Sequence, residues 1–390
     1  MFKDKQMTVA TSLFWIFLFG AVYSYFLYPL LLILMPKRRR VEAISETMPP
    51  SISPPKLSFV ITAFNEENGI RAKIENTLTV NYPPELLEII VASDGSTDST
   101  NDIVLEYAAQ GVRLAKVDEQ KGKENAQRFA IDQAKGDIIV FSDVSTRIEP
   151  QSLHIIANAF LDPEVGAVSS EDRFITSNGE VAGEGAYVKY EMWLRKLESS
   201  VCSLVGLSGS FFAARKEICA DWDITVPSDF NTALSCVLND KAAVTVPNLL
   251  GFYPNLADES KEYQRKLRTV IRGIAALFNR IEVANPFRFG FFAVQVISHK
   301  VMRWLVPWFL AGLMLTNLIL LGQGFIYQLI FIGQLAFYTV ATLGWVSQKL
   351  RLNSLIKIPF FFTQVNIAIA HATLQYLGGK RVTHWKPSKR

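Results

Sequence analysis

Short apolar runs alternate with polar clusters through the middle of this chain. Three of the runs cover residues 57–61, 87–92 and 137–141, and each is rich in Val, Ile, Leu or Phe. Their length and unbroken hydrophobicity are typical of strands buried in a parallel sheet. Segments 67–80 and 123–134, which lie between these runs, have the pattern of helices. This alternation predicts an α/β fold with a wound, mostly parallel sheet.

The pattern becomes less regular after residue 150. We expect a long helix over 183–200, a buried strand over 211–215, and helices over 229–238 and 262–278, the last strongly basic.

The N-terminal end of the chain is much more apolar than its middle. No charged residue occurs from Met7 to Met35, and this stretch exceeds the roughly 20 residues that cross a bilayer core. A secretory signal has a shorter apolar core of ~7–15 residues and a small-residue cleavage site, whereas the apolar stretch here is followed by Pro36 and then by four basic residues, 37–40. We therefore expect a retained transmembrane helix in the inner (plasma) membrane. Because basic flanks stay in the cytoplasm, the central domain should be cytosolic.

The C-terminal part is apolar again. Segments 305–321 and 325–346 are long enough to span, and 286–304 mixes aromatic and basic residues as an interfacial helix does. Segment 356–377 carries Gln, Asn and His, which favours an interfacial or re-entrant placement over a third crossing. The expected order is a transmembrane helix (7–35), a basic and proline-rich linker (36–55), a cytosolic domain (56–285), an interfacial helix (286–304), a transmembrane region (305–379) and a basic tail (380–390).

Composition refines this picture only slightly. The chain has 390 residues, a formal net charge of +4 and a mean hydropathy of +0.19. Its basic clusters flank the apolar segments, which indicates contact with anionic lipid head groups rather than nucleic acid. The three cysteines have no metal-type spacing, so we expect reduced, structural thiols.

Each of the three predicted strands is followed by polar residues, and ligands of open α/β sheets bind beyond the carboxyl ends of the strands. Asp94 follows the second strand, where it caps the next helix or accepts hydrogen bonds from the base or ribose of a nucleotide. Asp143 follows the third strand and offers a hard oxygen ligand suited to Mg²⁺ or Mn²⁺ with substrate phosphates.

Further charged residues have two interpretations each. Lys123 begins a predicted helix, where it neutralises phosphate charge or is simply solvated. Neither a Walker loop nor a dinucleotide-binding glycine pattern is present. Asp229 is a lone carboxylate before a helix, either a cap or a catalytic group. Arg265, Arg268 and Arg272 form one basic stripe, which suits a diphosphate clamp or a solvated or lipid-facing edge.

Taken in order, these blocks resemble membrane-bound inverting glycosyltransferases of family 2, which have the nucleotide-sugar-binding GT-A fold and include relatives of bacterial cellulose and hyaluronan synthases. Residues 62–67 (Thr-Ala-Phe-Asn-Glu-Glu) are similar to the family's opening Pro-Ala-Tyr-Asn-Glu-Glu, and 94–98 match its Asp-Gly-Ser-Thr-Asp block unchanged. Lys123 matches the phosphate-side Gly-Lys, and 206–210 with Arg215 resembles the glycine-rich acceptor-side block. Residues 143–146 align with Asp-x-Asp-Thr, with Ser145 replacing the second aspartate.

The resemblance implies a role for each matching residue. Asp229 would be the general base, although Ser228 stands where the family usually has Glu or Asp. Asp143 and Ser145 would hold Mg²⁺ or Mn²⁺. Residues implied to bind the nucleotide-sugar donor are Ala63, Asn65, Glu66, Asp94, Lys123, Asp143 and Arg268. Residues implied on the acceptor side are Gly209, Ser210 and Arg265.

The expected reaction moves a sugar from a nucleotide-diphosphate sugar to a hydroxyl of a membrane-associated glycan or lipid-linked acceptor, in polysaccharide or cell-envelope biosynthesis. Three alternatives stay open. A processive, exporting polysaccharide synthase is less favoured, because the family's Gln-x-x-Arg-Trp motif reads Arg265, Arg268 and Thr269 here. A non-catalytic scaffold that binds nucleotide sugar would fit the missing second metal aspartate. A nucleotidyltransferase would need a glycine-rich, arginine-bearing loop after the first strand, which is absent.

Overall fold

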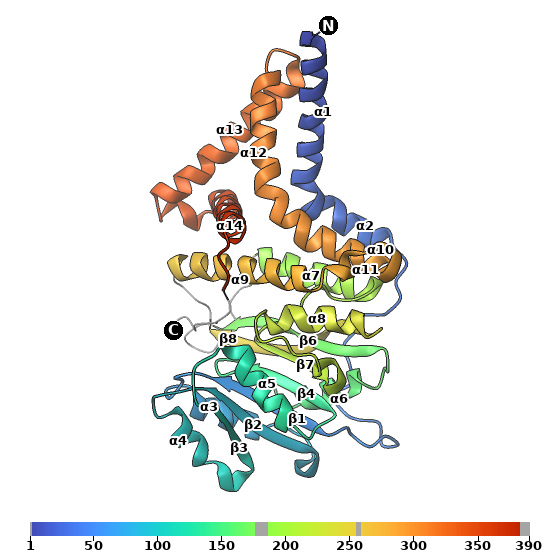
Figure 1. The fold of residues 1–390 in the computed structure, drawn as a ribbon, viewed down its shortest axis with the longest axis vertical. Helices are drawn as coiled ribbons and strands as arrows, with labels where there is room; N and C mark the ends of the chain where they lie inside the picture. Colours follow the sequence, from blue (N-terminus) through green and yellow to red (C-terminus); the bar gives the residue numbers. More distant parts are fainter. Residues whose placement is uncertain (1, 176–185, 255–258, 383–390) are drawn as a thin grey trace. The chain divides into compact units, whose positions relative to one another are not determined.

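The computed structural model describes residues 2–175, 186–254 and 259–382, which form two compact units (Figure 1). One unit carries a β-sheet and contains Leu34–Ala257 and Ala275–Gln295. The other carries long apolar helices and contains the N-terminal residues to Ile33, Asp258–Ile274 and Val296–Arg381. The expected domain boundaries stay predictions, because these units are built from segments that are discontinuous in the chain.

The sheet has eight strands in the order β3-β2-β1-β4-β7-β6-β8-β5. The strands are β1 (Leu57–Ala63), β2 (Leu87–Asp94), β3 (Val112–Val117), β4 (Ile138–Asp143), β5 (Arg147–Ile148), β6 (Val165–Ile175), β7 (Phe211–Arg215) and β8 (Ala242–Pro254). Strands β3, β2, β1 and β4 are mutually parallel, whereas β7 runs antiparallel to both of its neighbours, β4 and β6. Strand β8 pairs parallel with β6 and antiparallel with β5. The α/β class is confirmed, with a sheet that is parallel in its first half and mixed beyond β4.

Helices cover both faces of the sheet. Alternate residues of β1 divide between two cores, with Phe59 and Ile61 in one and Val60 in the other. The first core also contains residues of α3 (Ile70–Leu78), α4 (Thr100–Leu105) and α6 (Ser152–Ala159), and the second contains residues of α5 (Lys123–Gln133) and α8 (Ser228–Leu238). Burial on both faces explains why the first strands are continuously apolar in sequence.

Strands β6 and β8 were not expected. Strand β6 contains Ser169, Ser170, Glu171 and Asp172 in its middle, and β8 contains Pro247 and Asn248. Neither shows the unbroken apolar run or the strict alternation that predicts a strand. Long-range pairing of β6 with β7 and of β6 with β8 therefore decides their conformation.

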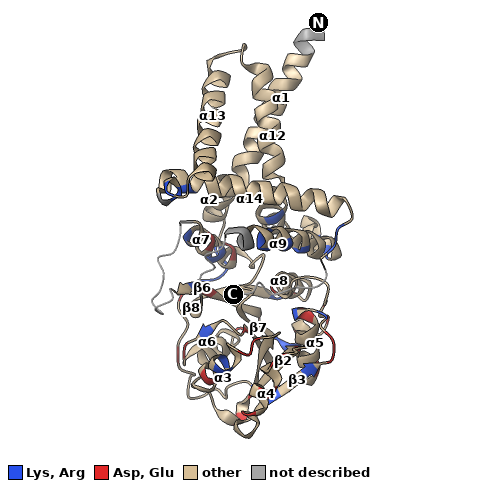
Figure 2. Cartoon of the chain, turned by 90° about the vertical axis from the view of Figure 1, so that its left-hand side faces the viewer, with Lys and Arg blue, Asp and Glu red and all other residues tan. Residues whose placement is uncertain are grey.

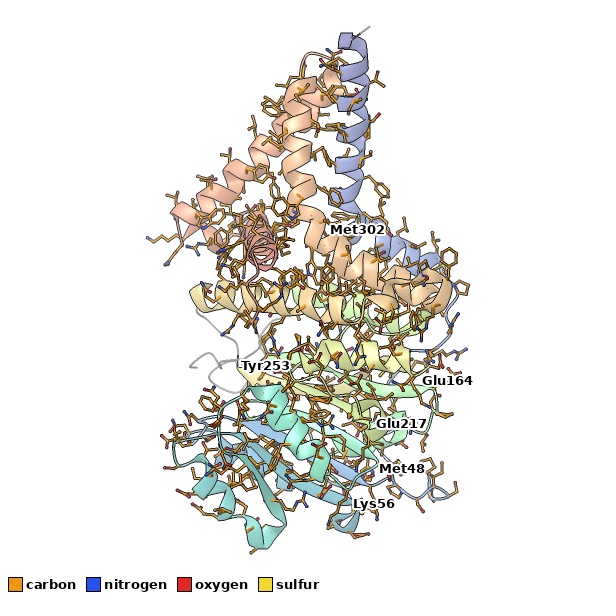
Figure 3. All side chains as sticks on the ribbon, viewed as in Figure 1. Met48, Lys56, Glu164, Glu217, Tyr253 and Met302 are labelled. Atoms are coloured by element: carbon orange, nitrogen blue, oxygen red, sulfur yellow. The ribbon has the colours of Figure 1, made fainter. Side chains whose placement is uncertain are left out.

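The linker 36–55 is held along the sheet-bearing unit. Arg39 donates from Nη1 to the Cys202 carbonyl (2.8 Å) and from Nη2 to Glu164 Oε2 (2.6 Å). The amide of Asn248 pairs with both backbone groups of Ile44, at 2.9 Å to its N–H and 2.8 Å to its carbonyl. Met48, labelled in Figure 3, packs against the first core. One arginine of the cluster expected at lipid head groups is thus bound to protein.

The second unit contains long apolar helices. Helix α1 (Phe2–Val22) continues through a π-helical turn (Tyr23–Leu27) into α2 (Tyr28–Leu34), and the other long helices are α9 (Glu259–Asn279), α12 (Met302–Leu320), α13 (Phe325–Val346) and α14 (Ser354–Leu377). Four stretches of the described chain are long and apolar enough to cross a membrane: Gln6–Leu34, Phe291–Leu320, Phe325–Val346 and Ser354–Leu377. Figure 2 shows α1, α12 and α13 with almost no charged residues along their length.

Helices α1 and α12 pack through glycines and aromatic rings. A Cβ atom at Gly20 would lie 2.6 Å from the Phe309 ring, and one at Gly312 would lie 2.6 Å from the Phe17 ring. The two contacts are reciprocal, one on each helix. Small residues let apolar helices approach closely where no hydrophobic force drives them together.

Two segments differ in detail from the expectation. Residues 286–304 do not form one helix, because α10 (Pro286–Phe289) ends at Gly290, where φ is +54°, and α11 (Phe291–Val296) then leads through a π-helical turn (Ile297–Val301) into α12. Residues 356–377 lie within the single helix α14, which has the length of a span. The interfacial and re-entrant placements of these segments stay predictions.

Candidate active site

Two polar loops interlock at the carboxyl ends of the adjacent parallel strands β1 and β2. Asn65 has a φ of +51°, a conformation that Asn tolerates better than most residues. Its Oδ1 accepts from the Thr97 N–H (2.8 Å), and its own N–H donates to Ser96 Oγ (3.1 Å). The N–H of Glu66 donates to Thr100 Oγ1 (2.8 Å). The Asn-Glu and Ser-Thr pairs singled out in the sequence therefore fix each other.

Asp94 ends β2, and its buried carboxylate binds backbone. It accepts from the N–H groups of Lys121 (3.0 Å) and Gly122 (2.9 Å). Gly95, with a φ of +69°, permits this closeness, because a Cβ there would lie 2.6 Å from the Gln120 nitrogen. Asp94 thus holds the loop that leads into α5, and its contact with a nucleotide stays a prediction.

Lys123 is the first residue of α5 and joins two loops. Its Nζ donates to Asp143 Oδ1 (2.5 Å) and to the Gly209 carbonyl (2.8 Å). Asp143 ends β4, and its N–H donates to the Ser210 carbonyl (3.0 Å). The predicted donor-side carboxylate and the predicted acceptor-side loop are therefore neighbours.

Asp229 reaches the same place from the first turn of α8. A Cβ at Gly209 would lie 3.2 Å from Asp229 Oδ2, which is closer than most Cβ contacts, so a larger residue there would press on this carboxylate. Hydrogen bonds thus join Asp94 to Gly122 and join Lys123 to both Asp143 and Gly209, and the Asp229 carboxylate lies beside Gly209. Their catalytic and binding roles stay predictions.

Sequence reasoning missed a half-buried carboxylate beside this loop. Asp172, on β6, accepts from Ser208 Oγ (2.5 Å) and Ser210 Oγ (3.2 Å), the residues on either side of Gly209. Burial raises the pKa of Asp172, against the opposing effects of the Arg195 charge and of hydrogen bonds from hydroxyl groups. No sequence signal marked it, because β6 itself was not predicted.

Sequence reasoning also missed a buried lysine. Lys73, on α3, donates from Nζ to Ser142 Oγ (2.7 Å) and to the Thr146 carbonyl (2.6 Å), on either side of Asp143 in the chain. Burial lowers the pKa of Lys73 to about 7, although the charge of Asp143 acts in the opposite direction. A lysine in a helical segment gives no sequence sign of being buried.

The residues present supply only some of the ligands that a divalent cation needs. Among residues 2–175, 186–254 and 259–382, no group of three or more His, Cys, Asp or Glu side chains could hold a metal. Asp143 supplies one carboxylate, and Ser145 lies two residues further along the same turn. Mg²⁺ is commonly bound by one or two carboxylates together with substrate phosphates, so this donor set fits an ion that arrives with a diphosphate.

The remaining predicted residues fall into two groups. Ala63 is buried at the end of β1, beside the donor-side loops. Arg265 and Arg268 lie on α9, within the segment of that helix that belongs to the other compact unit. Burial lowers the pKa of Arg268, and the charges of Arg272 and then Arg265 lower it further, so the stripe concentrates positive charge. The contribution of these arginines to the site stays a prediction.

Comparison with known proteins agrees with this architecture. Residues 58–221 match the family model described as Glycosyl transferase family 2. Poly-beta-1,6-N-acetyl-D-glucosamine synthases of Staphylococcus epidermidis and of Staphylococcus aureus (strain MSSA476) are 25% identical over 224 residues and 27% identical over 227 residues. These alignments cover 54% and 55% of this chain but 50% and 51% of the synthases, so the chain spans about half the length of the curated relatives it matches.

One solved structure is similar over nearly the whole chain. It is the mannosyltransferase PcManGT from Pyrobaculum calidifontis in complex with GDP-Man and Mn²⁺, with a TM-score of 0.68 and 19% sequence identity. The superposition covers 96% of this chain and 99% of that one. At this identity it shows the fold, and the expected GT-A architecture with apolar helices at both ends is confirmed.

Proposed function

We propose that this chain, which carries a glycosyl transferase family 2 domain, transfers a sugar from a nucleotide-diphosphate sugar to a hydroxyl group, with inversion, in cell-envelope polysaccharide biosynthesis. The observation that carries the proposal is the contact series from Asp143 through Lys123 and Gly209 to Asp229. It brings a carboxylate and a cation for a diphosphate close to a second carboxylate for a proton.

Asp229 is the proposed general base. It would take the proton from the acceptor hydroxyl as that oxygen attacks the anomeric carbon, and the nucleoside diphosphate would leave from the opposite face. Positioned proton transfer contributes about 10²–10⁴ in rate. A single base is sufficient, because inversion requires no covalent intermediate with the protein.

The proposed donor side would offset the negative charge of the leaving nucleoside diphosphate. Lys123 is the first residue of α5, so its ammonium group and the N-terminus of the helix would both face the departing diphosphate. Asp143 and Ser145 would hold Mg²⁺ or Mn²⁺, and a bound ion of this kind offsets the charge that develops on phosphate oxygens. The complex of the archaeal mannosyltransferase with Mn²⁺ supports this proposal.

The proposed acceptor belongs to the membrane. The four apolar helices would anchor the enzyme in the inner (plasma) membrane with its sheet-bearing unit in the cytoplasm, because the basic cluster at residues 37–40 follows the first helix. A membrane-borne glycan or a lipid-linked saccharide would then meet the site without diffusing through the cytosol, with membrane lipids around the helices.

The test is a donor screen with purified, full-length protein. Release of nucleoside diphosphate would be measured for a panel of activated sugars, with Mg²⁺, Mn²⁺ or EDTA. We expect metal-dependent release from one donor class, and a large loss of metal-dependent donor binding in Asp143→Ala. Asp132→Ala, which removes an exposed carboxylate paired with Arg128 on α5, is the matched control.

Two results would contradict the proposal. Nucleotide-sugar binding without any turnover would favour the non-catalytic scaffold. Metal dependence that is unchanged in Asp143→Ala would remove this residue from the metal site.

A further inference from the structure

Lys73 is a buried, titratable side chain that no step of the proposed reaction uses. Its Nζ bridges Ser142 Oγ (2.7 Å) and the Thr146 carbonyl (2.6 Å), which are the two ends of the turn that carries Asp143 and Ser145. Within that turn the Thr146 N–H donates to the Asp143 carbonyl (3.1 Å). The lysine therefore fastens the turn from inside the protein.

The same face of α3 also holds the next part of the chain. Asn76, one helical turn after Lys73, donates to the Ile148 carbonyl (3.0 Å) and accepts from the Ile148 N–H (2.9 Å). Residues three apart on a helix lie on the same side. Helix α3 thus binds the segment from Ser142 to Ile148 at four polar atoms.

We propose that Lys73 is a positioning residue for the donor side of the active site: it fixes the Ser142–Thr146 turn and thereby orients the Asp143 carboxylate toward the donor diphosphate. The inference rests on the proposed function and deepens it. Lys73 holds the backbone and the serine of the Ser142–Thr146 turn, whereas Lys123 contacts the Asp143 carboxylate itself.

A side chain that only filled the space beneath the turn would not need an amino group. Burying an ammonium ion carries a large desolvation cost, and an apolar side chain of similar volume would fill the space without it. The lowered pKa of Lys73 reflects that cost. The ring of Phe59, on the central strand β1, has its centroid 5.3 Å from Nζ and stabilises the cation only in part. The presence of a buried lysine at this position is explained if the oriented turn carries function.

The test uses the full-length protein and the variant Lys73→Met. Binding of UDP and of GDP, each with Mn²⁺, would be measured by calorimetry, together with the KM for the donor that the wild type uses. Loss of a side chain that orients a metal ligand typically weakens metal affinity or activity about 10- to 100-fold, and we expect a change of that size in nucleotide affinity and donor KM. Arg71→Met is the matched control, because Arg71 lies on the same helix but pairs with Glu106 at the surface.

A second variant covers the case in which Lys73→Met does not fold. Ser142→Ala leaves the lysine in place and removes one of its two partners, so it should give a smaller loss of the same kind. Nucleotide affinity and donor KM that stay at wild-type values in folded Lys73→Met, with only a lower melting temperature, would overturn the inference. A wild type that releases nucleotide from no donor would instead overturn the proposed function, and this inference with it.

Discussion

At the scale of single residues, one lysine connects two loops that are far apart in the sequence. Lys123 contacts Asp143 on one side and the Gly209 carbonyl on the other, and Gly209 leaves space for Asp229. Movement of the Lys123 side chain would therefore change its contacts with both the Asp143 carboxylate and the Gly209 loop, the proposed donor and acceptor sides. Electrostatic stabilisation of this kind depends on groups that are in place before the reaction.

The proposed base gives the sharpest residue-scale prediction. Asp229→Asn should abolish sugar transfer, with a fall in kcat of at least about 10²–10⁴, while nucleotide binding survives because donor contacts are unchanged. Single-turnover rates and nucleotide affinity would be measured on the same preparation. Asp240→Asn is the control, because Asp240 lies just beyond the same helix with a φ of +55°, which Asn also adopts. Near-normal turnover in Asp229→Asn would assign the base elsewhere.

At the scale of elements, the linker belongs to the sheet-bearing unit. Its contacts through Arg39 and Asn248 join the segment after the first membrane helix to α7 (Ala186–Val201) and to strands β6 and β8 and the loops next to them. A proline-rich segment in water is an extended spacer, but here side-chain hydrogen bonds give it a fixed path.

Asn248→Ala should release this segment. The variant loses both hydrogen bonds to Ile44, so we expect a loss of about 1–2 kcal/mol in unfolding free energy and faster proteolysis within residues 41–55. Limited proteolysis with mass spectrometry would measure it. Asn239→Ala, which removes only a bond to the Ser235 carbonyl on α8, should leave the linker protected. Equal cleavage in both variants would show that the amide pair does not hold the linker.

At the scale of the whole molecule, the prediction concerns the number of sugars that the proposed transferase adds during one encounter with its acceptor. The Gln-x-x-Arg-Trp motif of the synthases that the sequence resembles ends in tryptophan, whereas α9 has Thr269, whose hydroxyl donates to the Arg265 carbonyl (2.9 Å) of its own helix. No aromatic ring is therefore offered by that position to a growing polymer.

We expect single additions rather than long chains. Purified protein would be incubated with labelled donor and membrane-extracted acceptor, and product length would be read by gel or mass spectrometry, with Asp229→Asn as the blank. A ladder extending to long polymers would instead support a processive synthase that exports its product.

The first half of the sheet could be predicted from sequence because its strands are buried on both faces and its helices are periodic, so local pattern and final structure agree. The second half could not. Strands β6 and β8 contain polar residues whose burial depends on each other, and sequence alone does not reveal a partner more than 70 residues away.

The sequence by itself determined the α/β class, the polar loops after three strands and the apolar helices at both ends, because each follows from the order of neighbouring residues. Only the tertiary structure decided that Asp94 binds the loop before α5 and that Lys123 joins Asp143 to Gly209. It also decided that Lys73 lies buried beneath the Asp143 turn and that Asp172 accepts from the serines on either side of Gly209. These relations depend on which strand ends meet at one edge of the sheet, and chain order does not specify that edge.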